Sequence, residues 1–143
     1  MNPIQRIFHM LDIKLMSDRE ATMKLVRVLI VGILADRRIK KSEILRSKSI
    51  LREMLEPRMK NGDEVDVAVA IFERELEIYS TNNTKFDFMR KGIVDEIVKN
   101  REKNFATVLI AVFKSDGGIQ PEEQLIVRRL ASILTDEELS AIN

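Results

Sequence analysis

The chain has no cysteine and a single histidine, His9, among its 143 residues. The absence of cysteine excludes disulfide bonds, thiolate metal ligands and a cysteine nucleophile. A Ser-His-Asp triad or a histidine-rich zinc site would have to use His9, whose segment contains no nucleophile-bearing turn. No phosphate-binding loop or cofactor fingerprint is present either. We therefore expect a protein that is not an enzyme, with no catalytic residue and His9 as a partly exposed helix residue.

Glycine and proline are also scarce, with five and three residues respectively. This scarcity favours helices over a sheet protein with many turns, and no stretch alternates long enough to build a sheet. Hydrophobic residues make up 45% of the chain and charged residues 33%, which is typical of a soluble globular protein. The length fits one domain, residues 1–143. The fold class predicted is therefore all-α.

The chain also lacks long hydrophobic runs. The most apolar stretch, residues 25–35, is interrupted by Arg27 and is shorter than the roughly 18 residues that a membrane span needs. The first fifteen residues do not have the basic start, apolar stretch and cleavage site of a signal peptide. We expect a cytoplasmic protein in which residues 25–35 form a buried helix, with Gly32 permitting a close helix crossing.

Capping signals and hydrophobic spacing divide the chain into helices. Ser17 with Glu20 and Thr135 with Glu138 have the form of capping boxes, and Pro121 suits a first helical position. Residues 1–16 are predicted to form an amphipathic helix before a core at about 17–140. Ser42 is the expected cap of the second core helix, Thr84 opens the fourth, and that helix contains the hydrophobic residues Phe86, Phe88, Met89, Ile93 and Ile97. The core helices are expected at about 17–35, 42–55, 63–79, 84–97, 102–114, 121–134 and from 135 onward.

Two segments of the chain repeat at an offset of 80 residues. Each carries the pattern Asp-x-x-Ile-x-x-x-Glu, from Asp36 to Glu43 and from Asp116 to Glu123. In each copy an apolar helix ends near the aspartate, an isoleucine follows in the turn, and the glutamate falls in the first turn of the next helix. Further matches at the same offset are Val28, Leu29, Ile30, Ile39 and Leu45 with Val108, Leu109, Ile110, Ile119 and Leu125. The chain therefore contains a duplicated helical unit.

This duplicated motif resembles the TerB-like family, the helical domain of the tellurite-resistance protein TerB, whose signature Ala-Asp-Gly-x-Ile-x-x-x-Glu occurs twice. The resemblance covers about residues 17–140, including a closing helix at 125–134. It implies a compact bundle of about seven helices, acidic sites for a divalent metal ion, and a role in stress-response or chaperone-linked assemblies. The metal ligands it implies are Asp116, Glu123, Asp36 and Glu43. Arg37 departs from the family's glycine, so we expect the second copy to be the stronger site.

The chemistry of the second copy limits which ion it would take. The string from Asp116 to Glu123 matches half of a calcium-binding EF-hand loop, but the first two ligand positions would fall on Val112 and Lys114. A full calcium loop is therefore excluded. Oxygen ligands alone suit weak binding of calcium, magnesium or manganese. The alternative is that the carboxylates only stabilise turns and helix starts, an effect of roughly 0.3–1 kcal/mol at a helix N-terminus.

Charge is distributed unevenly along the chain. Residues 1–60 hold 14 Lys and Arg against 7 Asp and Glu, whereas residues 61–143 hold 10 against 16. The two parts either attract each other or attract outside partners. A basic face between residues 38 and 52 is a candidate protein-binding surface, and an acidic stripe is expected to face solvent. The basic face consists of Arg38, Lys41, Lys48 and Arg52, and the acidic stripe of Asp66, Glu73 and Glu77.

Other partners are less favoured by the sequence. Nucleic-acid binding is not expected, because the basic face has no interleaved aromatics and the net charge is only +1. The apolar side of residues 1–16 favours docking on the bundle over contact with a membrane. The sequence thus predicts a weak divalent-cation module or, alternatively, a metal-independent module that binds a protein partner through residues 38–52. The oligomeric state is not predicted.

Overall fold

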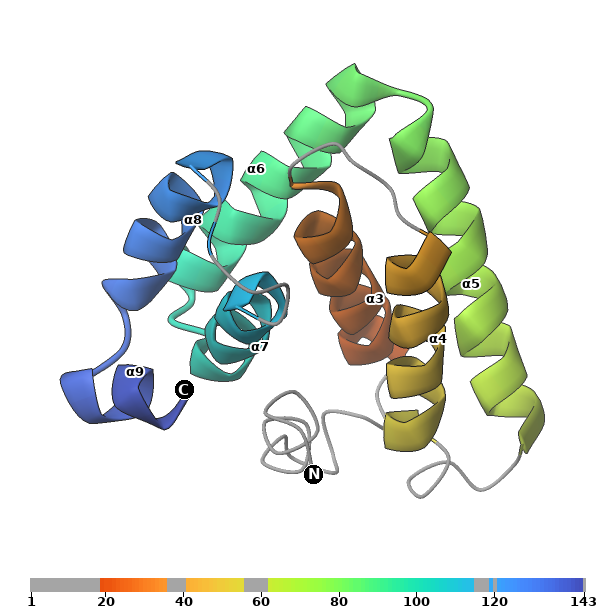
Figure 1. Cartoon of the computed structure of the whole chain (residues 1–143), viewed down its shortest axis with the longest axis horizontal. Helices are drawn as coiled ribbons and strands as arrows, with labels where there is room; N and C mark the ends of the chain where they lie inside the picture. The colour runs from red at the N-terminus through yellow and green to blue at the C-terminus, as the bar shows by residue number, and fades with distance from the viewer. Residues whose placement is uncertain (1–18, 36–40, 56–61, 115–118, 120, 143) are drawn as a thin grey trace.

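The computed structural model describes residues 19–35, 41–55, 62–114, 119 and 121–142. These residues form seven α-helices and no strand, which confirms the all-α class (Figure 1). The helices are α3 (Arg19–Leu34), α4 (Lys41–Leu55), α5 (Gly62–Ser80), α6 (Asn83–Lys99), α7 (Lys103–Lys114), α8 (Pro121–Ala131) and α9 (Asp136–Ala141). The predicted N-terminal helix at 1–16 and the capping box of Ser17 with Glu20 begin outside the described residues.

Several helix boundaries follow from local capping chemistry. Proline at position 121 begins α8, as the sequence predicts, because a proline needs no hydrogen-bond acceptor at the first helical position. The capping box of α9 is also confirmed. The Thr135 hydroxyl oxygen accepts from the backbone N–H of Glu138 at 3.1 Å, and the Glu138 carboxylate accepts from the backbone N–H of Thr135 at 3.0 Å.

Three predicted boundaries are wrong by one to three residues. The cap of α6 is Asn82 rather than Thr84, because Asn82 has an extended backbone and its side chain accepts from the N–H of Lys85 at 3.0 Å. Helix α4 begins at Lys41, so Ser42 lies inside the first turn. Helix α8 ends at Ala131, before Leu134, because the N–H groups of Ile133 and Leu134 bond to carbonyls only three residues back.

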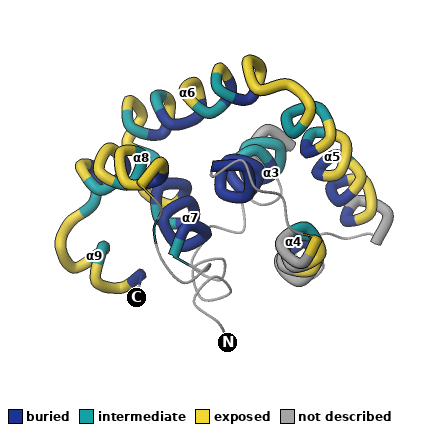
Figure 2. Tube along the Cα trace, turned by 45° about the horizontal axis from the view of Figure 1, so that its top comes forward, coloured by how far each residue is buried: buried dark blue, intermediate teal, exposed yellow. Residues whose placement is uncertain are grey.

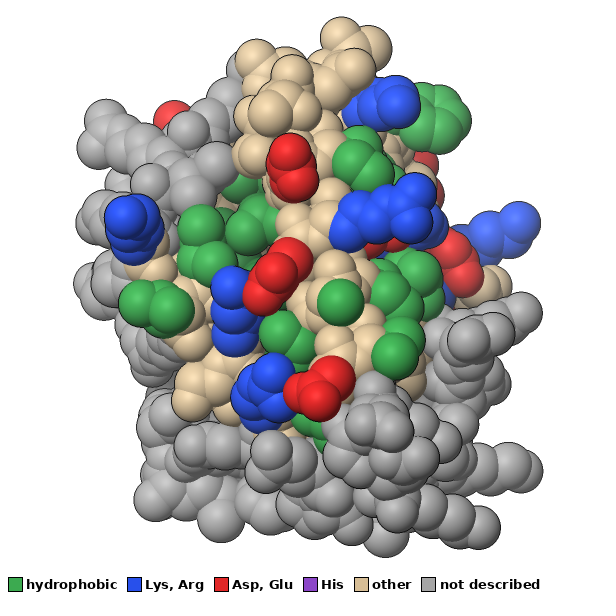
Figure 3. Space-filling model, turned by 90° about the vertical axis from the view of Figure 1, so that its right-hand side faces the viewer, with side chains coloured by type: hydrophobic (Ala, Val, Ile, Leu, Met, Phe, Trp, Pro, Cys, Tyr) green, Lys and Arg blue, Asp and Glu red, His purple; other side chains and the backbone are tan. Residues whose placement is uncertain are grey.

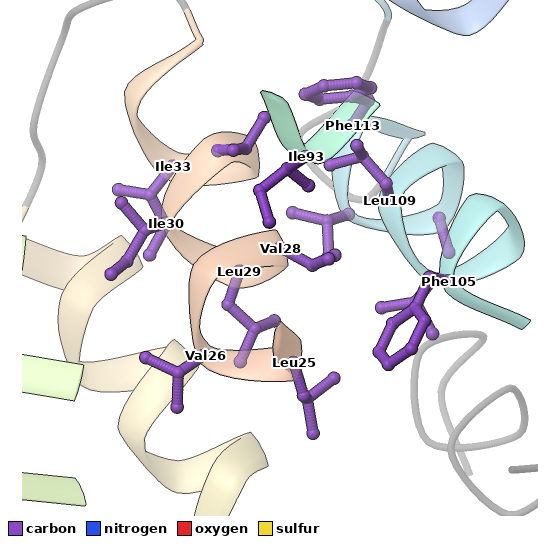
Figure 4. Packing of buried hydrophobic residues seen from close by; sticks show 14 of the residues in the cluster. Leu25, Val26, Val28, Leu29, Ile30, Ile33, Ile93, Phe105, Leu109 and Phe113 are labelled. Carbon is purple, nitrogen blue, oxygen red and sulfur yellow. The ribbon is translucent and has the colours of Figure 1, made fainter. Parts of the chain in front are cut away.

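The two inner helices of the repeat, α3 and α7, form the centre of the core. Residues 25–33 of α3 and 105–113 of α7 have the same burial class at every repeat-equivalent position, with only Arg27 and its counterpart Thr107 partly exposed. Figure 2 shows both helices almost entirely buried beneath the surrounding ones, and Figure 4 shows Val28 of α3 lying close to Leu109 of α7. The duplication seen in the sequence is therefore also a duplication of burial.

The inner helices approach each other most closely at Gly32. A Cβ atom at this position would lie 2.2 Å from Cγ1 of Val112, a separation that real side chains do not reach. Gly32 and Val112 occupy equivalent positions of the two copies. When two helices are related by an approximate two-fold axis, equivalent residues meet at the axis. The contact between Gly32 and Val112 therefore indicates such a relation between α3 and α7. The predicted role of Gly32 in a close crossing is confirmed.

The most apolar stretch of the chain, residues 25–35, is buried along its whole length except at Arg27. It contributes most of α3, as the sequence predicts. None of the helices in the described residues has the length and apolar character required to cross a membrane. The stretch is thus the first of two core helices, and α5, α6, α4 and α8 pack around the pair.

Candidate functional site

Of the four predicted metal ligands, Glu123 is the one whose side chain the structure describes. Asp36 and Asp116 lie outside the described residues, and so does the side chain of Glu43, although its place in the first turn of α4 is described. Glu123 lies in the first turn of α8, as the repeat predicts. The residue is 5% exposed, which makes it the one buried ionisable residue in the described part of the chain.

Glu123 is buried because of its position on α8. It shares a helix face with Ile126, Val127 and Leu130, and this face turns toward α6 and α7. Its neighbour Glu122 points to solvent. A buried carboxylate costs several kcal/mol unless hydrogen bonds, a positive charge or an ion compensate it. The N-terminus of α8 supplies part of this compensation, roughly 0.3–1 kcal/mol and more where the group is buried.

The described residues alone do not assemble a complete metal site. Among them there is no group of three or more His, Cys, Asp or Glu side chains placed to hold an ion. Any ion at Glu123 would therefore need further ligands from outside the described residues, from water or from backbone carbonyls.

The predicted basic face and acidic stripe meet each other in the structure. Lys48 lies 2.7 Å from the carboxylate of Glu73, and Arg52 lies 2.8 Å from that of Asp66. These contacts join α4 to α5, and Figure 3 shows the α5 side of the molecule with basic, acidic and hydrophobic side chains interspersed. The acidic stripe is exposed as expected. Its charge, however, balances much of the basic face, so the surface is less positive than the sequence suggests.

A second set of ion pairs, which the sequence reasoning missed, surrounds the start of α3. The ammonium of Lys24 lies 2.7 Å from Glu96 and 2.5 Å from Glu102, and it sits 5.4 Å from the ring centroid of Phe105. Its side chain is only 13% exposed. Spacing along one helix gives no signal for this cluster, because its members come from α3, α6, α7 and the residue before α7.

These contacts bear on one of the two explanations of the uneven charge, attraction between the two parts of the chain. In the described part of the chain, five ion pairs join bases of α3 and α4 to acids in residues 61–143. The fifth pair, between Arg27 and Glu75, is 3.3 Å long. The basic and acidic parts therefore attract each other within the molecule. Because most of these groups are partly exposed, each pair contributes on the order of 0–1 kcal/mol.

Four large hydrophobic side chains are exposed in the described residues. They are Leu45 of α4, Val67 of α5, Phe88 of α6 and Leu125 of α8. The sequence grouped Phe88 with the hydrophobic residues of its helix, but it lies on the opposite face from Phe86 and Ile93 and points to solvent. Leu45 and Leu125 occupy equivalent positions of the repeat. Their matching exposure shows that the duplication extends to the outer surface.

One carboxyl group has a perturbed acidity. The pKa of Glu138 is lowered from its ordinary value, first because its carboxylate accepts a hydrogen bond from the backbone of Thr135 and then because it accepts one from Lys103. Both contacts favour the ionised form. The first contact caps α9 and the second joins α9 to the start of α7, which indicates a structural role for this group.

Comparison of the chain with protein-family models, with curated proteins and with solved structures gives no match. The resemblance to the TerB-like family therefore depends on the duplicated Asp-x-x-Ile-x-x-x-Glu motif and the helix pattern around it.

Proposed function

We propose that this chain is a cytoplasmic, non-enzymatic, TerB-like helical domain that binds a divalent cation weakly at the turn before α8, in a stress-response setting. Asp116 and Glu123 would supply the carboxylates, and Asp36 and Glu43 would form a weaker site in the first copy. The observation that carries the proposal is the burial of Glu123 in the first turn of α8.

The argument for a cation rests on charge balance. The motif places a second carboxylate, Asp116, seven residues before Glu123 in a turn that contains Gly117 and Gly118. Two carboxylates that lie close together repel each other, and a divalent ion between them removes that repulsion. Oxygen ligands of this kind suit calcium, magnesium or manganese. In the first copy, Arg37 and Arg38 beside Asp36 repel a cation, which explains the expected difference between the copies.

Calorimetric titration with calcium, magnesium, manganese and zinc tests the proposal on three proteins: the wild type, an Asp116→Asn, Glu123→Gln double variant, and a Glu122→Gln control that changes the exposed neighbour. We expect heat and a raised melting temperature at millimolar ion in the wild type and the control only. An ion that binds only the folded state at 10 to 100 times its Kd stabilises it by roughly 1–3 kcal/mol. If the wild type responds to no ion, or if the double variant responds equally, the proposal of a cation site at Asp116 and Glu123 is rejected.

The first copy is tested in the same way with an Asp36→Asn, Glu43→Gln double variant. Because two arginines directly follow that aspartate in the sequence, we expect these substitutions to change the strongest ion response by less than twofold, about 0.4 kcal/mol or less. A larger change would assign the principal site to the first copy.

A second candidate function is protein binding at the surface of α4 and α5. The observation that favours it is the exposure of Leu45 and Val67, at 65% and 52%, on two helices that ion pairs join to each other. Such a mixture of apolar and paired charged groups fits a protein partner better than nucleic acid. Within the predicted basic face, the exposed Lys41 is the cleanest probe, because reversal of Lys48 or Arg52 would also break contacts with α5.

Chemical cross-linking in cells tests this second function with a Lys41→Glu, Leu45→Asp variant. Leu125→Asp is the matched control, because it changes the equivalent leucine of the other copy. A partner captured by the wild type and the control but lost in the double variant would support the surface. A partner retained by all three proteins would show that the surface of α4 and α5 does not bind it.

A further inference from the structure

The outer face of α6 is unusual among the surfaces of this domain. Phe88 is 83% exposed there, more than any other large hydrophobic side chain in the described residues. Thr84, Lys85, Lys91 and Gly92 share this exposed face, opposite the side that carries the buried residues of the helix. Figure 2 shows α6 arching over the two core helices with its exposed residues turned outward. The face is accessible along the length of the helix.

The face combines a protruding side chain with an open site one helical turn away. A Cβ atom at Gly92 would meet nothing within 4 Å, so a partner can reach the helix backbone there. If two α6 helices pair antiparallel about a two-fold axis at residue 90, Phe88 of each chain packs on Gly92 of the other. A two-fold interface requires this reciprocity, in which residue i meets residue j and j meets i.

The charges on the face fit the same register. A two-fold axis at residue 90 brings Lys85 of one chain opposite Asp95 of the other, twice, with Glu96 beside it. Asp95 and Glu96 already contact Arg129 and Lys24, at 2.6 Å and 2.7 Å. Their side chains nevertheless remain 47% and 53% exposed, which leaves oxygen atoms accessible to a second cation. Lys91 lies at the edge of the face near the axis, and its repulsion from its own copy limits the strength of pairing.

We propose that this protein forms a weak homodimer through an antiparallel pairing of two α6 helices, with Phe88 packed on Gly92 and Lys85 paired with Asp95 across the axis. Self-complementarity selects a second copy of the chain as the occupant of the face. One pair of helices buries less surface than the roughly 1,200–2,000 Å² of a stable complex, so the dimer is transient. This inference is independent of the proposed cation site.

Sedimentation velocity tests the proposal on the full chain at concentrations from about 10 μM to about 1 mM, where a weak interface is populated. We expect a monomer-dimer equilibrium that weakens with added salt and whose Kd rises at least about tenfold in Phe88→Asp. Leu125→Asp, a charge introduced at a similarly exposed position of α8, is expected to leave the Kd within about twofold. A protein that stays monomeric, or a dimer insensitive to Phe88→Asp, would overturn the proposal.

A charge-exchange experiment tests the two-fold register itself and does not depend on the Phe88 variant. Lys85→Glu places two like-charged pairs across the axis, and Asp95→Lys does the same with the opposite sign, so each protein alone is expected to dimerise more weakly. An equimolar mixture restores both attractive pairs and is expected to form a heterodimer with a Kd within about threefold of the wild type, because opposite charges face each other again. A mixture no tighter than its components would reject this register.

Discussion

The two copies of the repeat share their inner helix but differ in what surrounds it. Residues 25–33 and 105–113 are buried in the same order, although few of their side chains are identical. Among the described residues, Lys48 and Arg52 of α4 form ion pairs with α5, whereas Arg129 of α8 forms an ion pair with α6. Burial is therefore the property that both copies keep, while surface charge has diverged. The following predictions test how far this equivalence extends.

The largest effect is expected from truncating an equivalent pair of core leucines. Leu29 and Leu109 are 2% and 0% exposed, so Leu29→Ala and Leu109→Ala should each lower the free energy of unfolding by about 2–5 kcal/mol. Urea denaturation measures both values, with the exposed Leu125→Ala as a control that should change stability by less than about 0.5 kcal/mol. Losses that differ by more than about 2 kcal/mol would show that the copies are not energetically equivalent.

The next effect concerns the point at which the copies meet. Gly32→Ala places a methyl group against Val112, and we expect the overpacking to outweigh the gain in helix propensity and cost about 1–2 kcal/mol. Gly92→Ala is the matched control, because open space surrounds that glycine and the same propensity gain should stabilise the protein by about 0.5–1 kcal/mol. Thermal unfolding of both variants measures whether the two substitutions change the stability in opposite directions, as we expect.

A double variant attributes this cost to the contact itself. Val112→Ala removes the obstructing methyl groups, so Gly32→Ala should be less destabilising in that background by about 1 kcal/mol or more. Equal costs in the two backgrounds would mean that some other contact limits the approach of α3 to α7.

A third prediction concerns the turn that leads into α7, which has no counterpart at the equivalent place inside α3. Arg101 follows the end of α6 with a φ of 51°, and its N–H bonds to the carbonyl of Val98 while the N–H of Glu102 bonds to that of Ile97. This pattern is a Schellman motif, whose left-handed residue is usually glycine. Arg101→Gly should therefore stabilise the protein by about 1 kcal/mol in urea denaturation. A loss of stability would indicate that the guanidinium makes a contact of its own.

The smallest effect is expected at α9, and it depends on pH. Because the pKa of Glu138 is lowered in the folded protein, its contribution is fully present above the unfolded value of about 4.5 and is lost as the pH falls through the folded value. Glu138→Gln should therefore be less stable than the wild type at pH 7, and the two should converge as the pH falls below 4.5. Melting temperatures between pH 7 and pH 3 measure the difference in stability between the wild type and the variant. If the substitution acted only through a steric effect, this difference would not change with pH.

The sequence predicts the core of this fold better than its surface. Hydrophobic runs identify α3 and α7 as buried, and the 80-residue offset identifies their equivalence, because burial depends mainly on local composition and spacing. The sequence places Lys48 and Arg52 on one stripe and Glu73 and Asp66 on another. To predict that these residues pair, one must know which helices are neighbours, and the pattern of residues along a single helix does not contain that information.

The candidate site was predictable only in part. The motif places Glu123 in the first turn of a helix, and the structure confirms that position and adds its burial. The exposure of Phe88 is not predicted, because the sequence analysis names it only as one of the hydrophobic residues of its helix. Its angular position relative to Phe86 and Met89 was available in the sequence and indicates the opposite face.

The contact between Gly32 and Val112 restricts how similar the two copies can become. A chain built from two identical units would carry the same residue at both positions. Two valines would overfill the crossing and two glycines would leave it empty, so we expect alanine at both to be the best symmetric solution. Thermal unfolding of the three symmetric chains would rank them. The glycine and the valine thus fill the crossing unequally, and a designer who makes the two copies identical would have to change this position first.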